Sequence, residues 1–464
     1  MNPEIFREYD IRGIAGKDLT DEAVRTLGSA IGTYLWRQGC KQITLGRDCR
    51  LSSMRLKEQL SRGVLGTGLN VVDIGVCPTP LLYFSLYRLN PDGGIMITGS
   101  HNPPEYNGFK VAVGKFTIYG DQIQEVAKIA ESGDFAAGEG RMEKVSLLPD
   151  YHRYLVEAFG RLKSPPRVVV DAGNGTASII APQVYRDLGC EVIELYCTMD
   201  GNFPNHHPDP TVVDNLQDLI QRVCREQADV GIAFDGDGDR IGAVDDQGNI
   251  IWGDHLMILY SREILRERPG ATIIAEVKCS KNLYDDIEKN GGRGIMWRTG
   301  HSLIKAKMRE EKAALAGEMS GHMFFADRYF GYDDAVYGGA RLLEILSKSE
   351  RKISEMLADV PKTYSTPEIR VECPDRYKFE VVREAQEFFT RHYGTVTVDG
   401  VRVLFEDGWG LVRASNTQPA LVLRFEAESP QRLEEIRALI EGKLEEFMRK
   451  VVSEGSKFQV PSSK

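Results

Sequence analysis

The chain has 464 residues, a length that allows about three domains, each with its own hydrophobic core. Hydrophobic residues make up 42% and charged residues 27%, an ordinary soluble composition. The formal charge of -10 and the pI near 5.5 argue against nonspecific binding to nucleic acid or anionic membranes, so any anionic ligand needs a local cationic pocket.

Cysteine spacing and the N-terminal residues bear on the compartment. The eight cysteines are scattered without a CxxC pair, so the sequence indicates neither a zinc site nor a disulfide framework. The opening MNPEIFREYDIRG lacks the apolar core of a signal peptide, and no stretch approaches the ~20 apolar residues of a membrane span. We expect a cytoplasmic protein with no nucleic-acid or membrane partner, either a monomer or a homodimer.

Short apolar runs alternate with amphipathic segments along most of the chain, which is typical of α/β proteins. The runs lie at 43–48, 70–75, 93–97 and 168–175, and the pattern restarts at 230–234, 272–277, 294–300 and 313–321. Polar segments between them favour four units, which we place at 1–147, 148–250, 251–362 and 363–464.

The last unit reads differently, as a β-rich α+β module. It combines a helical stretch from about 378 to 393 with two strands joined through Glu406, Asp407 and Gly408. A closing helix is predicted with Ser429 as N-cap and Pro430 as its first residue. We expect the tail from Ser453 onward to be frayed.

The motif TGSHNP, residues 98–103, follows the apolar run GGIMI and would place Ser100 in a tight turn at the end of a strand. A serine there is a candidate nucleophile, because His101 can move a proton and the side chains of Thr98 and Asn102 can hold the loop. The alternative is an ordinary polar turn.

The motif DGDGDR, residues 235–240, follows the apolar run VGIAF. Carboxylates at Asp235, Asp237 and Asp239 can converge on one hard cation, because the glycines let the backbone curl around it. An EF-hand needs glycine and glutamate where this chain has Arg240 and Asp246, so a magnesium site open to substrate is the better interpretation. An acidic surface loop is the alternative.

Two further motifs offer polar groups to a ligand. GEMSGH, residues 317–322, supplies Glu318 and Ser320 for sugar hydroxyls and His322 for hydrogen bonding or proton transfer, although a satisfied polar turn would look the same. RASNTQP, residues 413–419, could surround a phosphate or simply form a hairpin loop; its candidate residues are Arg413, Ser415, Asn416 and Thr417.

These four motifs occur in the order and spacing of the α-D-phosphohexomutase superfamily, which the chain resembles over essentially its whole length. FREYDIRG near the N-terminus, FPNHHPDPTV at 203–212 and RTGHS at 298–302 resemble its bacterial phosphomannomutase/phosphoglucomutase branch. The resemblance implies α/β architecture with three domains of shared topology and a C-terminal α+β domain around a central cleft.

The resemblance also implies a reaction. Ser100, carried as phosphoserine, would phosphorylate the free hydroxyl of a mannose or glucose 1- or 6-phosphate. The bound 1,6-bisphosphate would then turn over and return its other phosphate to Ser100. Mg2+ and glucose 1,6-bisphosphate are the implied cofactor and activator, and phosphosugars the implied partners.

The implied site residues fall into three groups. The metal would be held by Ser100, Asp235, Asp237 and Asp239, with Arg240 supporting the loop. The catalytic set is Ser100, Arg12, His101, Lys110, His301 and His322; Lys110 is favoured as the base, which requires a lowered pKa, but the roles of Lys110, His301 and His322 stay open. Substrate would be bound by Tyr9, Lys278, Glu318, Ser320, Arg413, Ser415, Asn416 and Thr417.

Several alternatives are weighed against this hypothesis. A phosphoglucosamine mutase tends toward GEQSGH and RPSGTEP, which this chain lacks. A phosphatase would leave the paired sugar and phosphate loops without a purpose. A dinucleotide-binding oxidoreductase could be read from residues 168–178, but Ser178 stands where the motif needs glycine or alanine. A noncatalytic cation-binding protein would need only DGDGDR.

Overall fold

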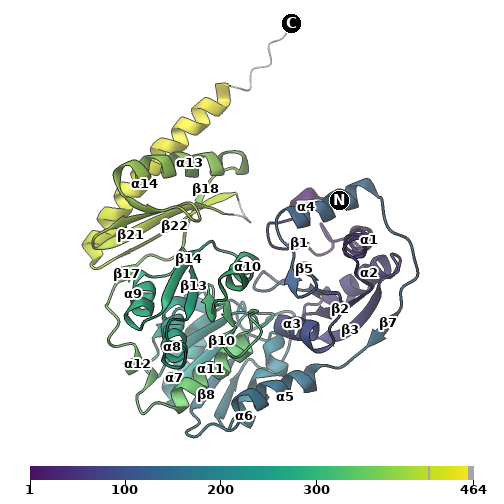
Figure 1. Cartoon of the computed structure of the whole chain (residues 1–464), viewed down its shortest axis with the longest axis horizontal. Helices are drawn as coiled ribbons and strands as arrows, with labels where there is room; N and C mark the ends of the chain where they lie inside the picture. The colour runs from purple at the N-terminus through teal and green to yellow at the C-terminus, as the bar shows by residue number, and fades with distance from the viewer. Residues whose placement is uncertain (416–418, 458–464) are drawn as a thin grey trace. The chain divides into compact units, whose positions relative to one another are not determined.

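The computed structural model describes residues 1–415 and 419–457, with side chains to Val451, and these residues form four sheets (Figure 1). The chain divides into two compact units. Unit 1 comprises residues 1–274, 285–294 and 300–358, and unit 2 comprises residues 275–284, 295–299 and 359–464. No helix among the described residues combines the length and apolar composition needed to cross a membrane.

The first sheet has the strand order β1-β5-β4-β2-β3-β7, with β6 paired to β5. Its strands are β1 (Ile11–Ile14), β2 (Gln42–Arg47), β3 (Asn70–Val76), β4 (Gly93–Ile97), β5 (Tyr106–Val113), β6 (Phe116–Thr117) and β7 (Met142–Lys144). The helical segments here are η1 (Pro3–Ile5), α1 (Asp21–Arg37), α2 (Ser53–Leu65), α3 (Thr79–Arg88) and α4 (Asp121–Ser132).

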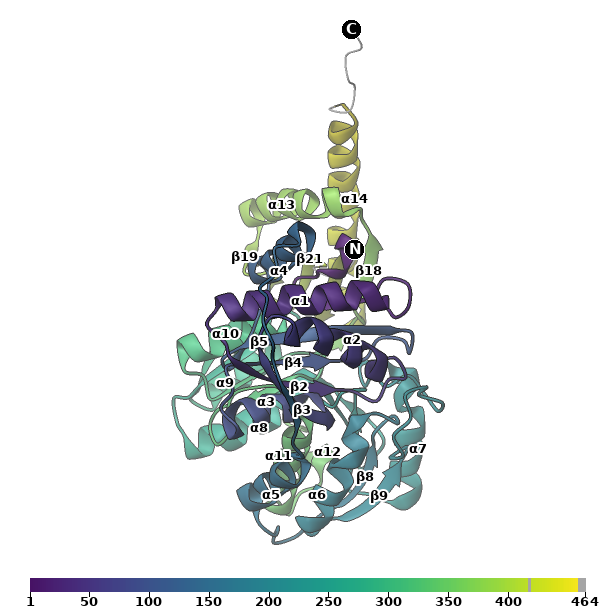
Figure 2. The same ribbon diagram turned by 90° about the vertical axis from the view of Figure 1, so that its right-hand side faces the viewer.

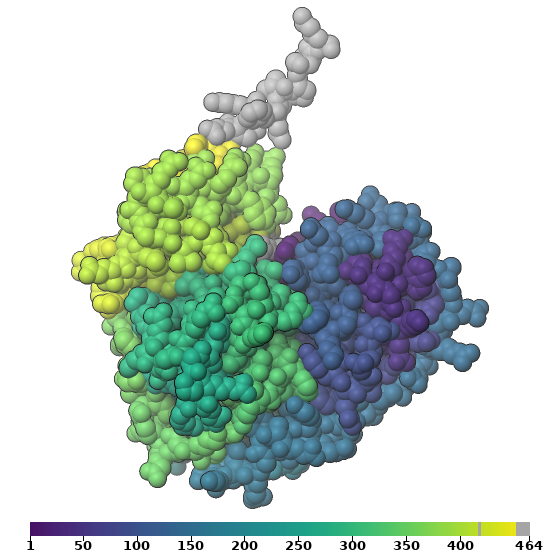
Figure 3. All heavy atoms as spheres, in the orientation of Figure 1, coloured from purple at the N-terminus to yellow at the C-terminus, as the bar shows by residue number. Residues whose placement is uncertain are grey.

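Helices cover both faces of this sheet because successive strand residues point to opposite faces (Figure 2). Ile43, Leu45 and Ile95 share a core with α1, α2 and α4. Between them in sequence, Thr44 accepts a hydrogen bond from Ser85 of α3 on the other face. In the space-filling view, residues from the N-terminus to about 160 form one continuous surface, coloured purple to blue (Figure 3).

The second sheet has the order β12-β11-β10-β8-β9, with β8, β9 and β10 parallel and β11 and β12 antiparallel to their neighbours. Its strands are β8 (Arg167–Asp171), β9 (Glu191–Leu195), β10 (Val230–Phe234), β11 (Ile241–Asp245) and β12 (Ile250–Ile251). The helical segments are α5 (Leu148–Phe159), η2 (Thr176–Ile179), α6 (Ala181–Asp187), η3 (Val213–Leu216) and α7 (Gln217–Glu226).

The third sheet has the order β14-β13-β15-β16, and the boundary between the two units runs through β13 and β14. Its strands are β13 (Thr272–Glu276), β14 (Arg293–Trp297), β15 (Leu315–Gly317) and β16 (Met323–Phe325). The accompanying helices are α8 (Gly253–Glu267), α9 (Lys281–Lys289), α10 (His301–Glu311), α11 (Ala335–Ser347) and α12 (Ile353–Met356).

The fourth sheet, in unit 2, is antiparallel, with the order β17-β22-β21-β20-β19 and β18 paired to β22. Its strands are β17 (Tyr364–Ser365), β18 (Ile369–Glu372), β19 (Gly394–Val396), β20 (Val401–Phe405), β21 (Gly408–Ala414) and β22 (Ala420–Ala427). Helices α13 (Asp375–His392) and α14 (Pro430–Lys457) pack on one face, as Figure 1 shows.

The opposite face of the fourth sheet holds the segment 275–284 within unit 2. Arg402, 1% exposed, lies 3.6 Å from the Trp409 ring and donates to the carbonyl oxygens of Val277 and Cys279, each at 2.7 Å. Glu426 accepts from Ser280 at 3.0 Å and from the Trp409 indole at 2.9 Å. These buried hydrogen bonds tie the segment after β13 to the C-terminal sheet.

The predicted fold class is confirmed: three mixed α/β sheets precede a β-rich α+β module. Ser429 accepts from the Arg432 amide at 3.2 Å and Pro430 begins α14, as predicted. Helix α14 continues to Lys457, so the expectation of a frayed tail from Ser453 is wrong as far as that residue. Each sheet falls within one predicted domain apart from Ile251, and the domain boundaries themselves stay predictions.

Candidate active site

Ser100 lies in a strained, buried turn at the end of β4. Its φ of 48° is in the left-handed region that a non-glycine residue rarely adopts, and its side chain is nearly inaccessible. The backbone amide donates to Oγ1 of Thr98 at 2.8 Å, and Asn102 donates to the Gly99 carbonyl at 2.8 Å, as the sequence predicted. Oγ of Ser100 donates to Oδ2 of Asp235 at 2.8 Å and lies 3.3 Å from Nδ1 of His101.

Arg50, which the sequence analysis did not single out, fixes this turn. Its guanidinium donates to the carbonyl oxygens of Ser100 at 2.8 Å, Asn102 at 2.6 Å and Tyr106 at 3.0 Å, and to Asp48 at 3.1 Å. A Cβ at residue 99 would lie 2.4 Å from Nε of Arg50, so only glycine fits there. The turn that carries Ser100 is therefore rigidly held.

The acidic loop, residues 235–240, follows β10 and faces the serine. Oδ1 of Asp235 accepts from the amides of Asp239 and Arg240, both at 3.1 Å, which curls the loop around its own carboxylates. A Cβ at residue 236 would lie 2.6 Å from the Ser100 carbonyl oxygen, so glycine is required at this close approach.

The three loop aspartates are fully buried and carry more negative charge than their partners neutralise. Oδ2 of Asp237 accepts from Thr79 at 2.6 Å, Thr98 at 3.0 Å and Lys110 at 3.1 Å, and Lys110 also contacts Oδ2 of Asp239 at 2.5 Å. The Oδ1 atoms of Asp237 and Asp239 have no hydrogen-bond partner. Burial, and then the neighbouring Asp237 and Asp239, raise the pKa of Asp235 well above its ordinary value.

These features fit a bound cation. One carboxylate oxygen from each of Asp235, Asp237 and Asp239 lies within 4.8 Å of the others, and carboxylate oxygens are the ligands that hard divalent cations prefer. The two partnerless oxygens would otherwise be left desolvated at a cost of about 1–3 kcal/mol or more each. The described residues therefore place a candidate metal site directly beside the Ser100 hydroxyl.

Lys110 donates to two of the loop aspartates. Although burial lowers it, its pKa is held well above the ordinary value by Asp237 and then Asp239. An ammonium group that donates to two carboxylates has no lone pair to accept a proton.

His322 is held by two groups, one on each ring nitrogen. Nε of Arg240 donates to Nε2 at 3.0 Å, so Nε2 is the acceptor and the proton lies on Nδ1. Nδ1 lies 3.0 Å from Oδ2 of Asp333, at an angle that falls short of a standard hydrogen bond. Although burial raises it, the pKa of Asp333 is held well below its ordinary value by Lys305, at 3.1 Å, and by His322.

Asp239, His322 and Asp333 could also be considered as ligands of a second metal, since their donor atoms lie within 4.8 Å of one another. That site would need the Nδ1 lone pair, which the Arg240 hydrogen bond leaves protonated. Lys305 already supplies a positive charge to Asp333. The arrangement is therefore a carboxylate that orients an imidazole.

His301, Glu318 and Tyr9 surround the same region within unit 1. Oε1 of Glu318 accepts from the Gly300 amide at 2.7 Å, which joins the GEMSGH loop to the RTGHS loop. The ring of His301 lies edge-on to Tyr9 at 6.1 Å and stacks on His322 at 5.6 Å. Burial, and then Lys305, lower the pKa of His301 well below its ordinary value.

Arg12 and His101, two other predicted residues, lie near Ser100, and the predicted Ser320 lies in the GEMSGH loop. Arg12 pairs with Asp10. Burial, and then Arg240 and Arg12, lower the pKa of His101 well below its ordinary value, so its imidazole is neutral. Ser320 is partly exposed in the GEMSGH loop.

The remaining substrate-binding candidates lie in unit 2. Arg413 donates to Asp399 at 2.9 Å, and Lys278 donates to Glu368 at 3.1 Å. Ser415 is buried after β21, and its amide donates to the Ala420 carbonyl at 2.9 Å. Asn416 and Thr417 lie outside the described residues.

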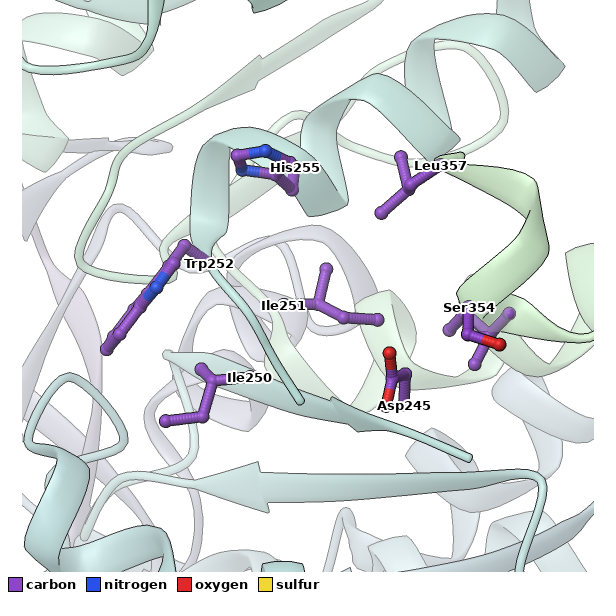
Figure 4. A pocket seen from close by; sticks show the side chains of 8 residues that line it. Asp245, Ile250, Ile251, Trp252, His255, Ser354 and Leu357 are labelled. Carbon is purple, nitrogen blue, oxygen red and sulfur yellow. The ribbon is translucent and has the colours of Figure 1, made fainter. Parts of the chain in front are cut away.

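Unit 1 also contains hollows away from these loops. One, of about 190 Å³, is lined by Ile250, Ile251, Trp252 and Leu357 together with His255 and Ser354 (Figure 4). Its carboxylate, Asp245, already accepts from the amides of Gln247 and Asn249. None of its lining residues belongs to the loops around Ser100, and it offers no nucleophile-base pair.

Two residues of the site were missed, and only one had a signal in the sequence. Asp333 and Asp334 precede the apolar helix α11, and Asp334 is its N-cap, accepting from the Tyr337 amide at 2.9 Å. An acidic pair at a predicted helix start could have drawn attention to Asp333. Nothing near Arg50 indicates that it would reach residues 100–106.

Comparison with known proteins matches most of the chain. Family models for the α/β/α domains I, II and III and for the C-terminal domain of phosphoglucomutase/phosphomannomutase match residues 3–137, 149–248, 252–364 and 368–443. The phosphomannomutase/phosphoglucomutase of Pseudomonas aeruginosa is 48% identical over 95% of each chain, and a phosphoglucomutase of Neisseria gonorrhoeae is 46% identical over 94% of this chain and 95% of its own.

A solved structure agrees. The crystal structure of a phosphoglucomutase/phosphomannomutase family protein from Burkholderia thailandensis superposes with a TM-score of 0.90 at 43% identity, over 96% of this chain and 97% of that one.

Fold, site and matches together define a phosphohexomutase, an isomerase that transfers a phosphoryl group within a sugar phosphate. The chain belongs to the phosphoglucomutase/phosphomannomutase family. The resemblance predicted from four motifs is confirmed, and the alternatives of a noncatalytic cation-binding protein and a dinucleotide-binding oxidoreductase are wrong.

Proposed function

We propose that the chain is a magnesium-dependent phosphohexomutase that interconverts the 1- and 6-phosphates of mannose and glucose through phosphorylated Ser100. The observation that carries this proposal is the Ser100 hydroxyl, 2.8 Å from Asp235 and beside two buried carboxylate oxygens without partners. The names of the relatives support both sugars as substrates.

Asp235, Asp237 and Asp239 would hold Mg2+. When bound, the ion neutralises charge on the phosphoryl group, which is the main need of a loose phosphoryl-transfer transition state. Arg240 supports this loop through its backbone amide and contacts His322 through its side chain.

In the first half-reaction the bond between phosphorus and Oγ of Ser100 breaks and a bond forms to the free hydroxyl oxygen of the sugar phosphate. The hydroxyl proton passes to a base. In the second half-reaction the other phosphoryl group of the bisphosphate returns to Ser100, and the sugar oxygen that loses it regains a proton.

We assign the base to His322 in place of Lys110. Nε2 of His322 holds the ring's one lone pair, which accepts from Arg240; the sugar hydroxyl would take the place of Arg240 as the donor, and Asp333 supports this tautomer. Nζ of Lys110 instead donates to Asp237 and Asp239. Lys110 would then act as a fixed positive charge beside the phosphoryl group.

Substrate is assigned to the remaining candidates. Arg413 and Ser415, with Asn416 and Thr417, would bind the phosphate that does not react. The sugar hydroxyls would contact Tyr9, Lys278, Glu318, Ser320 and His301. We also propose domain boundaries at 147, 250 and 362. We propose a cytoplasmic location, and the eight cysteines, all free thiols, agree with a reducing compartment.

Intact-mass measurement with peptide mapping tests the proposal. Incubation with Mg2+ and glucose 1,6-bisphosphate should add a single phosphate at Ser100, coupled to interconversion of mannose or glucose 1- and 6-phosphates. Ser100→Ala should accept no phosphate at residue 100 and lose the interconversion. Retention of sugar-phosphate isomerisation by Ser100→Ala would refute the mechanism.

A further inference from the structure

A chain of partly buried polar contacts within unit 2 connects two residues proposed to bind substrate, Arg413 and Lys278. Oδ2 of Asp399 accepts from Nε of Arg413 at 2.9 Å and from the backbone amide of Thr299 at 3.1 Å. Asp399 therefore joins strand β21 to the residue that follows β14 by two positions.

Glu276, at the end of β13, continues the chain. Its Oε2 accepts from the Thr299 hydroxyl at 2.5 Å, and its Oε1 lies 3.4 Å from Nζ of Lys278. Nζ of Lys278 also donates to Glu368 at 3.1 Å. We refer to these six residues as the polar chain, namely Arg413, Asp399, Thr299, Glu276, Lys278 and Glu368.

Burial makes these contacts energetically important. Glu276 is fully inaccessible, and the side chains of Arg413, Asp399 and Lys278 are at most 11% exposed. A buried carboxylate is retained only where charge and hydrogen bonds compensate for its lost hydration. Lys278 lowers the pKa of Glu368 to about 2, and burial, which raises it, offsets only part of this effect. The Glu368 carboxylate is therefore charged.

The contacts also have the geometry that an anion site requires. Arg413 meets Asp399 through Nε, and a guanidinium recognises phosphate well only when its plane is fixed. Lys278 is a flexible point charge, and two carboxylates hold its ammonium group. Thr299 links Asp399 and Glu276, the two carboxylates that contact Arg413 and Lys278.

We propose that Asp399, Thr299 and Glu276 are positioning residues that hold Arg413, which binds the phosphate, and Lys278, which contacts the sugar, as one recognition element for a sugar phosphate. This inference rests on the proposed function, since it names the residues that orient two of its substrate-binding side chains. The alternative is that Asp399 and Glu276 only compete with the phosphate for the two cations. The two readings predict opposite changes in affinity.

Binding of glucose 6-phosphate to full-length Ser100→Ala protein, measured by calorimetry, separates them. Loss of a charge-assisted hydrogen bond that orients Arg413 should weaken binding about 10-fold or more in Asp399→Asn, following the worth of such bonds. Glu276→Gln should weaken it by a smaller factor. Competition would instead make both variants bind more tightly, and either tighter or unchanged binding would overturn the inference.

A double-mutant cycle shows whether the effect passes through the arginine. In an Arg413→Ala background, Asp399→Asn should cause no further loss, because the group it positions is gone. A loss of the same size in both backgrounds would mean a structural role only. Thr299→Val removes the hydroxyl that donates to Glu276 with little change of shape, and it should weaken binding as Glu276→Gln does. It tests the same link if Glu276→Gln folds poorly.

Asp407→Asn is the matched control, because its carboxylate pairs with Arg432 elsewhere in unit 2 and lies outside the polar chain. It should bind like the parent. Mutase turnover is measured separately on protein that retains Ser100. Binding without turnover would refute only the proposed function, and failure of the parent to bind glucose 6-phosphate would refute both.

Discussion

The acidic loop of unit 1 and the polar chain of unit 2 both bury carboxylates, but they balance them in opposite ways. In the acidic loop, Asp237 and Asp239 share one lysine, and each keeps an oxygen without a partner. In the polar chain, Asp399 and Glu276 each contact a cation and a second donor.

This difference indicates whether each region suits a positively or a negatively charged ligand. An excess of buried carboxylate oxygen fits a cation, whereas cations backed by carboxylates fit an anion. Substitutions in the acidic loop, at Asp333 next to it and at the buried Asp334 test this difference.

The largest effect should come from the acidic loop. Asp237→Ala removes a proposed metal ligand and one of the two carboxylates that hold Lys110. Metal stabilisation of the transferring group is worth several kcal/mol, so turnover should fall about 1000-fold in steady-state assays. Asp399→Asn should leave Mg2+ dependence unchanged; a variant at residue 237 that keeps wild-type turnover and metal dependence would break the comparison.

The second prediction concerns the carboxylate that orients His322. Asp333→Asn keeps the size but can present an amide N–H to Nδ1 and favour the wrong imidazole tautomer. The turnover number for glucose 1-phosphate should fall about 100-fold, within the range for general-base catalysis, with little change in KM. Asp246→Asn, whose carboxylate contacts Lys352, is the control. A change confined to KM would contradict the assignment.

The smallest effect concerns Asp334, whose buried carboxylate accepts from two tyrosines, Tyr151 and Tyr329, each at 2.7 Å, and from the Tyr337 amide. Burial outweighs these hydrogen bonds and raises its pKa to about 6. The folded protein therefore binds this proton more tightly than the unfolded chain, and the resulting stabilisation is complete below about pH 4 and is lost as the pH rises to 6.

Asp334→Asn resembles the protonated form at every pH. The substitution should therefore cost about 2 kcal/mol less stability at pH 7.5 than at pH 4.5, measured as the difference from wild type in thermal unfolding. Equal costs at both pH values would show that the folded carboxylate titrates normally. Tyr151→Phe, which removes one donor and leaves the carboxyl group, should keep the pH dependence.

The strand-loop motifs could be predicted because they depend on local sequence. Ser100 and Asp235 follow the apolar strands β4 and β10, and Thr98 and Asn102, which hold the turn, lie two residues on either side of Ser100. The carboxyl ends of strands commonly carry such loops.

The state of Lys110 could not be predicted in the same way. It depends on Asp237 and Asp239, which lie 127 and 129 residues further along the chain. The role of Arg50 likewise depends on hydrogen bonds to residues 100–106, which lie about 50 residues further along the chain. Periodicity and motif spacing carry no information on such pairings, and the polar chain of unit 2 was missed for the same reason.

The bracing of the Ser100 turn by Arg50 has a consequence for the order of events in catalysis. Arg50 holds this backbone through the carbonyl oxygens of Ser100 and Asn102, so the backbone of Ser100 does not move between two acceptor positions. If one phosphate site serves both half-reactions, the sugar must rotate end over end between them. The serine then stays in place while the sugar reorients, and an inhibitor that binds tightly in one orientation would stop the cycle by blocking that rotation.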